Sequence, residues 1–194
     1  KHQLATEIRR VIVFGKPTLS RQVTALFFNE EIETVVVRSN THGLFDVAHR
    51  AKQFVDEISV DSEVNFSWLA NWRAADAENE FAFEEQLDRA NLVRELYFAS
   101  DQNDCIVLGA SRLIREADSM APAKPIAVFS NRGLSGIDGT IATATGIAIA
   151  NHDFFSDHGV DSFGVTRALM GDLTALHDVG SLAFDQQDKD LNLQ

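Results

Sequence analysis

Residues 130–139, Ser-Asn-Arg-Gly-Leu-Ser-Gly-Ile-Asp-Gly, form a glycine-rich stretch between a predicted strand and a predicted helix of small residues. Three glycines in seven residues, Gly133, Gly136 and Gly139, let the backbone adopt positive φ and approach a ligand closely. The helix expected from Thr140 would point its N-terminal amides at an anion. The stretch matches neither Gly-x-Gly-x-x-Gly nor a P-loop, so a plain glycine turn before a packed helix is the alternative.

The segments around this stretch alternate between strand-like and helical patterns. Four short strands are predicted in the second half of the chain, at Cys105–Gly109, Pro125–Ser130, Val165–Gly171 and Asp190–Gln194, with helices at Arg112–Met120 and Thr140–Ala150. This order predicts an α/β fold, in which a parallel sheet carries helices on both faces. The carboxyl ends of its strands would share one edge, where ligands bind in such sheets.

The first half of the chain predicts a second parallel unit. Strands are expected at Val11–Gly15, Thr34–Arg38 and Ala51–Val55, with helices at Thr18–Phe28 and Val64–Arg73, the latter holding Trp68 and Trp72. We therefore expect one domain over residues 1–73, an acidic linker over 74–84, and a second domain over 85–194. The second domain is predicted to begin with an amphipathic helix between Phe83 and Leu96.

The composition limits the classes of partner. The formal net charge of −12 and a hydrophobic content of 45% indicate a globular protein that does not bind nucleic acid or an anionic membrane. A single cysteine, Cys105, excludes an internal disulfide and favours a reducing, cytoplasmic location. No signal peptide or membrane-spanning run is recognisable.

One carboxylate follows a predicted strand directly. Asp172, in Gly171-Asp-Leu-Thr174, could bind a hard cation such as Mg²⁺ through oxygen, together with the phosphates of a ligand. The alternative is that Asp172 only caps the short helix that follows.

Three arginines lie at or just beyond the predicted strand ends: Arg21, Arg115 and Arg132. Guanidinium groups match carboxylates in bidentate fashion, so such a cluster would favour anionic substrates. Each could instead be a surface arginine, although Arg132 lies inside the glycine turn, where a long charged side chain has no packing role. The spacing of His152, His158 and His177 fits no common zinc pattern. Ser111 lacks the sequence context of a hydrolase nucleophile.

The residues 130–148, read with Gly171-Asp-Leu-Thr-Ala-Leu-His-Asp178, resemble the 2-succinyl-5-enolpyruvyl-6-hydroxy-3-cyclohexene-1-carboxylate synthases of menaquinone biosynthesis. Pro17-Thr-Leu-Ser-Arg21 and Gly109-Ala-Ser-Arg-Leu-Ile-Arg115 match family segments in the same order. The resemblance implies a partial thiamine-diphosphate-binding fold plus part of a Rossmann-like central domain. It also implies that the chain is a piece of a three-domain enzyme, without the N-terminal domain whose glutamate activates the cofactor.

The resemblance assigns roles residue by residue. Asp172 would ligate Mg²⁺, or Mn²⁺ in its place, and Gly171, Asp172, Leu173 and Thr174 would line the diphosphate. Ile137 would support the bent cofactor, with Ser135 and Gly136 near its pyrimidine. The substrate carboxylates would be held by Arg21, Ser111, Arg115 and Arg132. The family usually has Asn before that serine, whereas this chain has Ala110, which is a departure in the polar detail of the site.

The implied activity is a transferase reaction that depends on thiamine diphosphate. 2-Oxoglutarate is decarboxylated, and the resulting succinyl-semialdehyde carbanion adds in 1,4 fashion to isochorismate. The parent enzyme would be a homo-oligomer, and this chain alone is expected to be inactive, with a second metal ligand beyond Gln194. Two other hypotheses about the function remain: another thiamine enzyme, such as an acetolactate-synthase relative, and a non-catalytic binding module.

Overall fold

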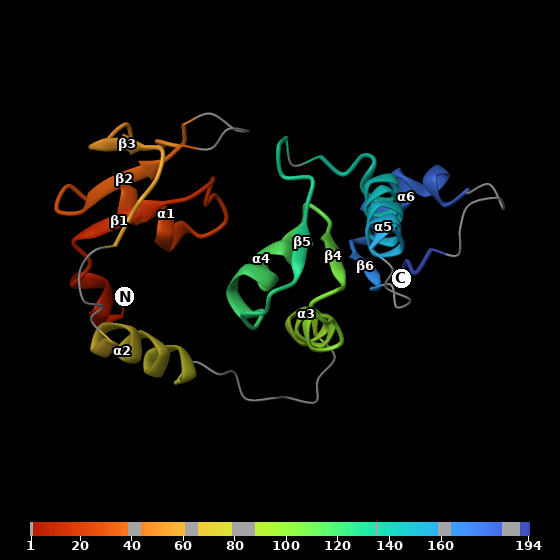
Figure 1. The fold of residues 1–194 in the computed structure, drawn as a ribbon, viewed down its shortest axis with the longest axis horizontal. Coiled ribbons are helices and arrows are strands. Elements are labelled where there is room, and N and C mark those ends of the chain that lie inside the picture. The colour runs from red at the N-terminus through yellow and green to blue at the C-terminus, as the bar shows by residue number, and fades with distance from the viewer. Residues whose placement is uncertain are drawn as a thin grey trace. The chain divides into compact units, whose positions relative to one another are not determined.

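The computed structural model describes residues 2–38, 44–60, 66–78, 88–134, 136–158, 164–183 and 191–194. The chain forms two compact units, Lys1–Phe83 and Glu84–Gln194. Each unit contains a parallel three-stranded sheet with helices (Figure 1). The predicted α/β class is therefore confirmed.

The first unit holds a sheet of order β1-β2-β3. Its elements are η1 (Gln3–Thr6), β1 (Arg10–Val13), α1 (Arg21–Phe27), β2 (Glu33–Val37), β3 (Gln53–Val55) and α2 (Phe66–Ala77). Ser20 caps α1 by accepting a hydrogen bond from the Val23 amide at 3.2 Å. Phe27 of α1 packs with Val13 and Val36 of the sheet, which places α1 against the strands.

Helix α2 extends further than the sequence predicts. The first residues of the predicted linker, Ala74-Ala-Asp-Ala77, belong to the helix. Alanine has the highest helix propensity, so the helix that begins at Phe66 continues through this alanine-rich run. The rest of the predicted linker lies outside the described residues after Glu78.

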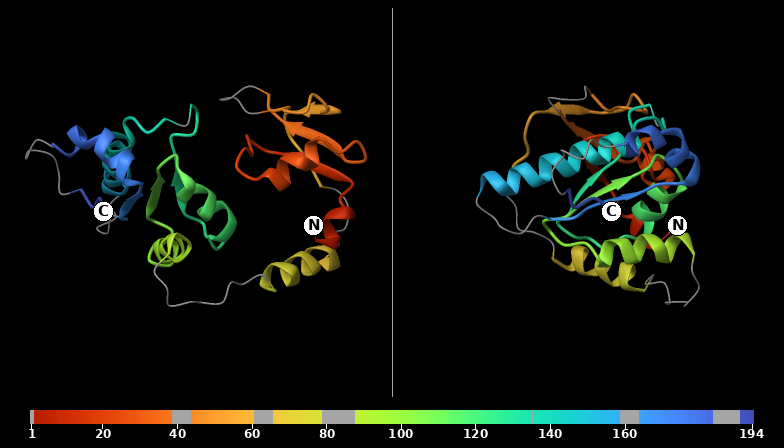
Figure 2. Two further views of the ribbon diagram at one scale, coloured as in Figure 1. Left: turned by 180° about the vertical axis from the view of Figure 1, so that it is seen from behind. Right: turned by 90° about the vertical axis from the view of Figure 1, so that its right-hand side faces the viewer.

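The second unit holds a sheet of order β5-β4-β6. Its elements are α3 (Arg89–Phe98), β4 (Cys105–Leu108), α4 (Arg112–Met120), β5 (Ala127–Phe129), α5 (Thr140–Asp157), β6 (Thr166–Leu169), α6 (Asp172–His177) and η2 (Val179–Leu182). All four residues of the central strand β4 are buried. Burial of both strand faces requires cover on both sides, and α4 and α5 lie on opposite sides of the sheet (Figures 1 and 2).

Two elements of this unit differ from the prediction. Helix α5 runs seven residues beyond Ala150, because Asn151 ties it to the sheet side through bonds to the carbonyls of Asn103 at 3.3 Å and Gly164 at 3.5 Å. The predicted last strand is present only as a parallel bridge between Leu193 and Thr166, and residues 184–190 lie outside the described part. The predicted helix between Phe83 and Leu96 is described from Arg89, with Asp88 as its cap.

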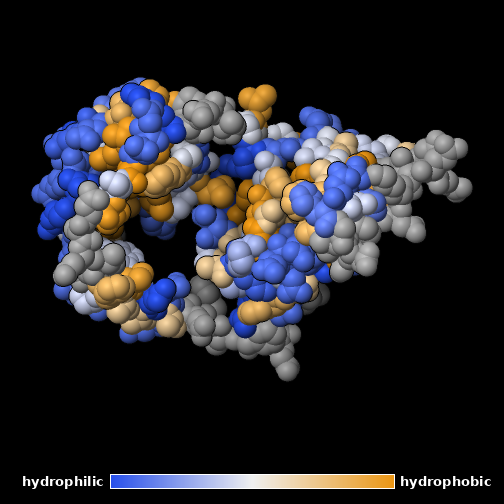
Figure 3. Space-filling model, viewed as in Figure 1, coloured by the Kyte–Doolittle hydropathy of each residue, from blue (hydrophilic) through white to orange (hydrophobic). Residues whose placement is uncertain are grey.

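The described surface mixes polar and apolar residues in both units (Figure 3). Within the described ranges, the structure contains no helix that combines the length and the apolar character needed to cross a bilayer.

Candidate functional site

The ends of β4, β5 and β6 meet at one edge of the second sheet. The Ser130 hydroxyl, directly after β5, donates a hydrogen bond to the carbonyl of Leu108 at 2.6 Å. The Gly109 amide, directly after β4, donates to the carbonyl of Leu169 at 2.9 Å. The structure thus brings the glycine turn, the segment after β4 and the segment after β6 to one edge, as the strand order predicts.

Gly109 allows the ends of β4 and β6 to approach closely. A Cβ atom at this position would lie 3.0 Å from the Cβ of Met170 and 3.2 Å from its Cα. Any larger residue would have to displace the chain that leads directly into Gly171 and Asp172. The position of the predicted metal ligand therefore depends on a glycine directly after the neighbouring strand β4.

The glycine turn is fastened to the first turn of α5. Asn131 donates from Nδ2 to the Thr143 hydroxyl at 3.2 Å, and that hydroxyl donates to the carbonyl of Gly139 at 2.7 Å. Gly139 has a φ of 65°, which favours glycine, so it supplies the left-handed residue that starts the helix. Gly136 is exposed and Ile137 is half-buried, whereas Ser135 lies outside the described residues.

The N-terminus of α5 is occupied by a carboxylate of the chain itself. Asp178 Oδ2 accepts hydrogen bonds from the amides of Ile141 at 2.7 Å and Ala142 at 3.0 Å. The sequence predicts that these amides attract an anion, but that anion is the Asp178 side chain. The expectation that a ligand phosphate uses them is therefore corrected, because their donors are already satisfied.

Two further contacts hold the same junction. The Ser181 hydroxyl donates to Asp178 Oδ1 at 2.7 Å, and His177 Nδ1 lies 2.7 Å from Asp138 Oδ1. The bond from Ser181 and the bonds from the amides of Ala142 and Ile141 lower the pKa of the Asp178 carboxyl below its ordinary value. Asp178 is not among the residues that the sequence predicts for the site.

Asp172 is the first residue of α6, and Gly171 occupies the N-cap position. The alternative interpretation of Asp172 as the capping residue is therefore wrong, because the backbone turn places the cap one residue earlier. The Asp172 carboxylate is exposed, and no hydrogen bond or ion pair to it occurs among the described residues. Its oxygens are available to a cation from solvent. Leu173 is also exposed, whereas Thr174 is buried at 3% exposure.

Arg132 carries an unsatisfied donor. Its Nε atom is buried and has no hydrogen-bond partner within the described part of the chain. A buried guanidinium N–H without an acceptor is costly in the free protein. An anionic ligand would satisfy it.

The other predicted substrate residues have defined places. Ser111 caps α4, since its hydroxyl oxygen accepts from the Leu113 amide at 3.1 Å, and its proton remains free to be donated. Arg115 is exposed on α4 in the same unit. Arg21 is the first residue of α1 and belongs to the first unit.

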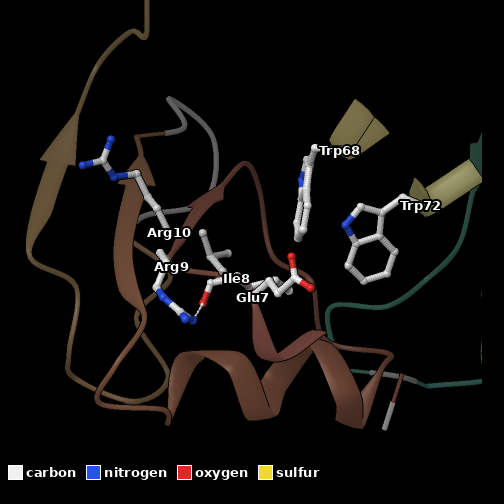
Figure 4. A pocket seen from close by; sticks show the side chains of 7 residues that line it. Glu7, Ile8, Arg9, Arg10, Trp68 and Trp72 are labelled. Carbon is white, nitrogen blue, oxygen red and sulfur yellow. Dashed lines mark hydrogen bonds between the residues drawn. The ribbon is translucent and has the colours of Figure 1, made fainter. Parts of the chain in front are cut away.

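A separate pocket lies in the first unit, where Trp68 and Trp72 of α2 face the segment Glu7–Val11 (Figure 4). The two indoles meet edge to face, with ring centroids 5.8 Å apart. No predicted site residue lines this pocket. Within the described ranges, no group of three or more His, Cys, Asp or Glu side chains could hold a metal by itself.

The chain is similar to several curated proteins named 2-succinyl-5-enolpyruvyl-6-hydroxy-3-cyclohexene-1-carboxylate synthase. The relative from Clavibacter michiganensis subsp. michiganensis is 40% identical over 210 residues, which cover 90% of this chain and 35% of the relative. The relative from Leifsonia xyli subsp. xyli is 35% identical over 90% of this chain and 36% of its own length. The relative from Renibacterium salmoninarum is 37% identical over 96% of this chain and 33% of its own length. No protein-family model matches the chain.

Proposed function

We propose that this chain, which is homologous over about a third of their length to the 2-succinyl-5-enolpyruvyl-6-hydroxy-3-cyclohexene-1-carboxylate synthases, forms part of the cofactor and substrate site of such a synthase. The whole enzyme would act in menaquinone biosynthesis and would join 2-oxoglutarate, after its decarboxylation, to isochorismate. The observation that carries the proposal is the single sheet edge that gathers the Arg132 turn and Asp172.

The cofactor proposed for this edge is thiamine diphosphate with Mg²⁺. When bound, thiamine diphosphate supplies the electron sink for the decarboxylation. Two features of the chain fit this group. The Asp172 carboxylate is exposed and available to a hard cation. A Cβ atom on Gly171 would meet no heavy atom within 4 Å, so the backbone beside Asp172 is open to a ligand.

The diphosphate would lie along Gly171–Thr174, where the backbone follows β6. It would not use the N-terminal amides of α5, which already bind Asp178. Ile137, on the glycine turn, would contact the organic part of the cofactor. Asp172 would hold the metal, and the glycine turn would support the organic part of the cofactor.

Both proposed substrates carry carboxylates, which gives the cations of the edge a function. Arg132 has a buried Nε donor that lacks an acceptor, and the Ser111 hydroxyl has a proton to donate. Hydrogen bonds from these groups would hold and orient a carboxylate before reaction. Arg115 and Arg21 are proposed to bind the same class of anion.

Metal binding by the chain itself tests the proposal. Mn²⁺, a paramagnetic substitute for Mg²⁺, should broaden the amide NMR signals of Leu173 and Thr174 in a titration of the full chain. The broadening should vanish in Asp172→Asn and persist in Asp157→Asn, which removes an equivalent exposed carboxylate at the far end of α5. Equal broadening in both variants would remove Asp172 as the metal ligand.

A further inference from the structure

The end of α6 is joined to the start of α5 by a compact set of polar contacts. Asp178 Oδ2 accepts from two amides of α5, and its other oxygen accepts from the Ser181 hydroxyl. Beside it, His177 Nδ1 lies 2.7 Å from Asp138 Oδ1, on the glycine turn. We call these contacts of Asp178, Ser181, His177 and Asp138 the α5–α6 clamp.

The clamp acts on a very short helix. Helix α6 has six residues and spans about 9 Å, with Asp172 at its start and Asp178 directly after its end. The start follows β6, which pairs with β4, so the sheet limits its position but leaves the direction of the helix axis open. The end is fixed only if something holds it to the rest of the unit.

The apolar side chains of α6 contribute little to holding the helix in place. Leu173 is 70% exposed and Leu176 is 67% exposed, so two of the large side chains of the helix do not pack in the described structure. Thr174 is its buried residue. Polar contacts at Asp178 therefore make a major contribution to the orientation of the helix.

We propose that Asp178 is a positioning residue, whose carboxylate binds the N-terminal amides of α5 and thereby holds α6, with Asp172 at its start, in a fixed place beside the glycine turn. The inference rests on the proposed function in one respect, the assignment of Asp172 as the metal ligand. The same contact closes the α5 amides to phosphate groups, so one carboxylate both aligns the metal ligand and directs the diphosphate elsewhere.

A nitroxide label on α6 tests the position of the helix without any metal. Leu176→Cys provides an exposed attachment point, and the native Cys105 is buried at 7% exposure, where desolvation raises the pKa of its thiol and slows labelling. The label should broaden the amide signals of Gly139, Thr140 and Ile141 in the full chain. In Asp178→Ala this broadening should fall, because α6 moves away from the turn.

Amide hydrogen exchange in the unlabelled chain is a second measurement of the contact between Asp178 and α5. The amides of Ile141 and Ala142 should exchange about tenfold faster in Asp178→Ala than in the wild type. Asp178→Asn keeps a carbonyl acceptor and should lie between the two. Asp118→Ala, which removes an exposed carboxylate from α4, is the charge-matched control and should change neither reading.

The outcomes separate this inference from the proposed function. Unchanged label broadening in a folded Asp178→Ala variant would overturn the positioning role, whatever Mn²⁺ does. Absence of Mn²⁺ broadening at Leu173 in the wild-type chain would count against Asp172 as a metal ligand, which belongs to the proposed function, and would leave the label result to decide the clamp. If Asp178→Ala does not fold, Asp178→Asn decides: faster exchange of the Ile141 and Ala142 amides together with label broadening equal to wild type would overturn the role.

Discussion

A Cβ atom on Gly109 would lie 3.0 Å from the Cβ of Met170, so the chain that leads to Asp172 passes directly beside the end of the central strand. This contact is tighter than ordinary van der Waals packing and involves backbone as well as side-chain atoms. The proposed metal ligand is thus placed by the backbone of β4 and β6, and its position responds to changes in the neighbouring strand.

Gly109→Ala should displace the end of β6 by a few tenths of an ångström and cost about 1–2 kcal/mol of stability. Chemical denaturation measures the loss, and Mn²⁺ broadening at Leu173 should weaken with it. Gly180→Ala is the matched control, because Gly180 lies exposed in η2 and its Cβ would meet nothing within 4 Å. Equal effects of the two substitutions would contradict the close approach.

Gly164→Ala should destabilise far more than Gly109→Ala. The added Cβ would lie 1.8 Å from the carbonyl oxygen of Asn103, a backbone atom that cannot give way without moving the start of β4. We expect a loss of at least about 3 kcal/mol. Urea or thermal unfolding provides the measurement, and a variant as stable as the wild type would show that this contact is absent.

Gly146→Ala should have the opposite sign. Gly146 is inside α5 at an exposed position, and its Cβ would meet nothing within 4 Å. Alanine lowers the entropy of the unfolded chain and favours the helix, so a gain of about 0.5–1 kcal/mol is expected. A destabilised variant would indicate that α5 packs more tightly on this side than the structure shows.

The Asp104–Arg167 ion pair should make stability depend on pH. Burial raises the pKa of the Asp104 carboxyl, but the amides of Asp101 and Val165 and the Arg167 guanidinium, 2.5 Å away, outweigh it and leave the pKa lowered. A lowered pKa in the folded state gives stability that is present above the ordinary pKa of Asp. That stability is lost as pH falls through the lowered value.

The stability lost when the Asp104 carboxylate is removed should depend on pH in the same way. Asp104→Asn leaves the Arg167 side chain, which is 16% exposed, without its carboxylate partner and should cost about 3 kcal/mol at neutral pH. The difference in stability from the wild type should shrink as pH falls below the ordinary Asp range. A difference that stays constant down to the lowest pH at which both proteins fold would contradict the assignment.

Arg132→Ala should weaken the use of carboxylate substrates. A charge-assisted hydrogen bond contributes enough that KM for 2-oxoglutarate or isochorismate should rise about tenfold or more. The assay needs a complete enzyme, such as the Clavibacter relative with its matched third replaced by this chain. Arg132→Lys should recover part of the loss by restoring the charge without the bidentate fork. Wild-type kinetics in Arg132→Ala would remove the residue from the substrate site.

The sequence predicts most of the sheet edge at which β4, β5 and β6 end. It predicts little of the contact between α5 and α6. Apolar runs ending in glycine or a polar residue located β4, β5 and β6, and the parallel order brought Ser130 and Gly171 to one edge. Asp178 could not be found in this way, because its partners, the amides of Ile141 and Ala142, are 37 and 36 residues earlier in the chain. Backbone donors carry no sequence signal.

Two helix boundaries also differ from those that the sequence pattern predicts. The run Ala74–Ala77 looks like the start of an acidic linker, but it continues α2 because alanine favours a helix. Helix α5 extends beyond Ala150 because Asn151 binds carbonyls that are distant in sequence. Contacts of this kind decide where an element ends, and they become visible only when the chain is folded.

The most direct test of the account is the reaction of the Clavibacter chimera with Asp172 intact and substituted. The chimera should release carbon dioxide from 2-oxoglutarate and consume isochorismate only with Mg²⁺ and thiamine diphosphate, and it should not use pyruvate in place of 2-oxoglutarate. Asp172→Asn should lower kcat/KM about a hundredfold or more, whereas Asp157→Asn should not. Equal activity of these two variants would contradict the assignment of Asp172 as the metal ligand, and a folded chimera that turns over only pyruvate would contradict the proposed function.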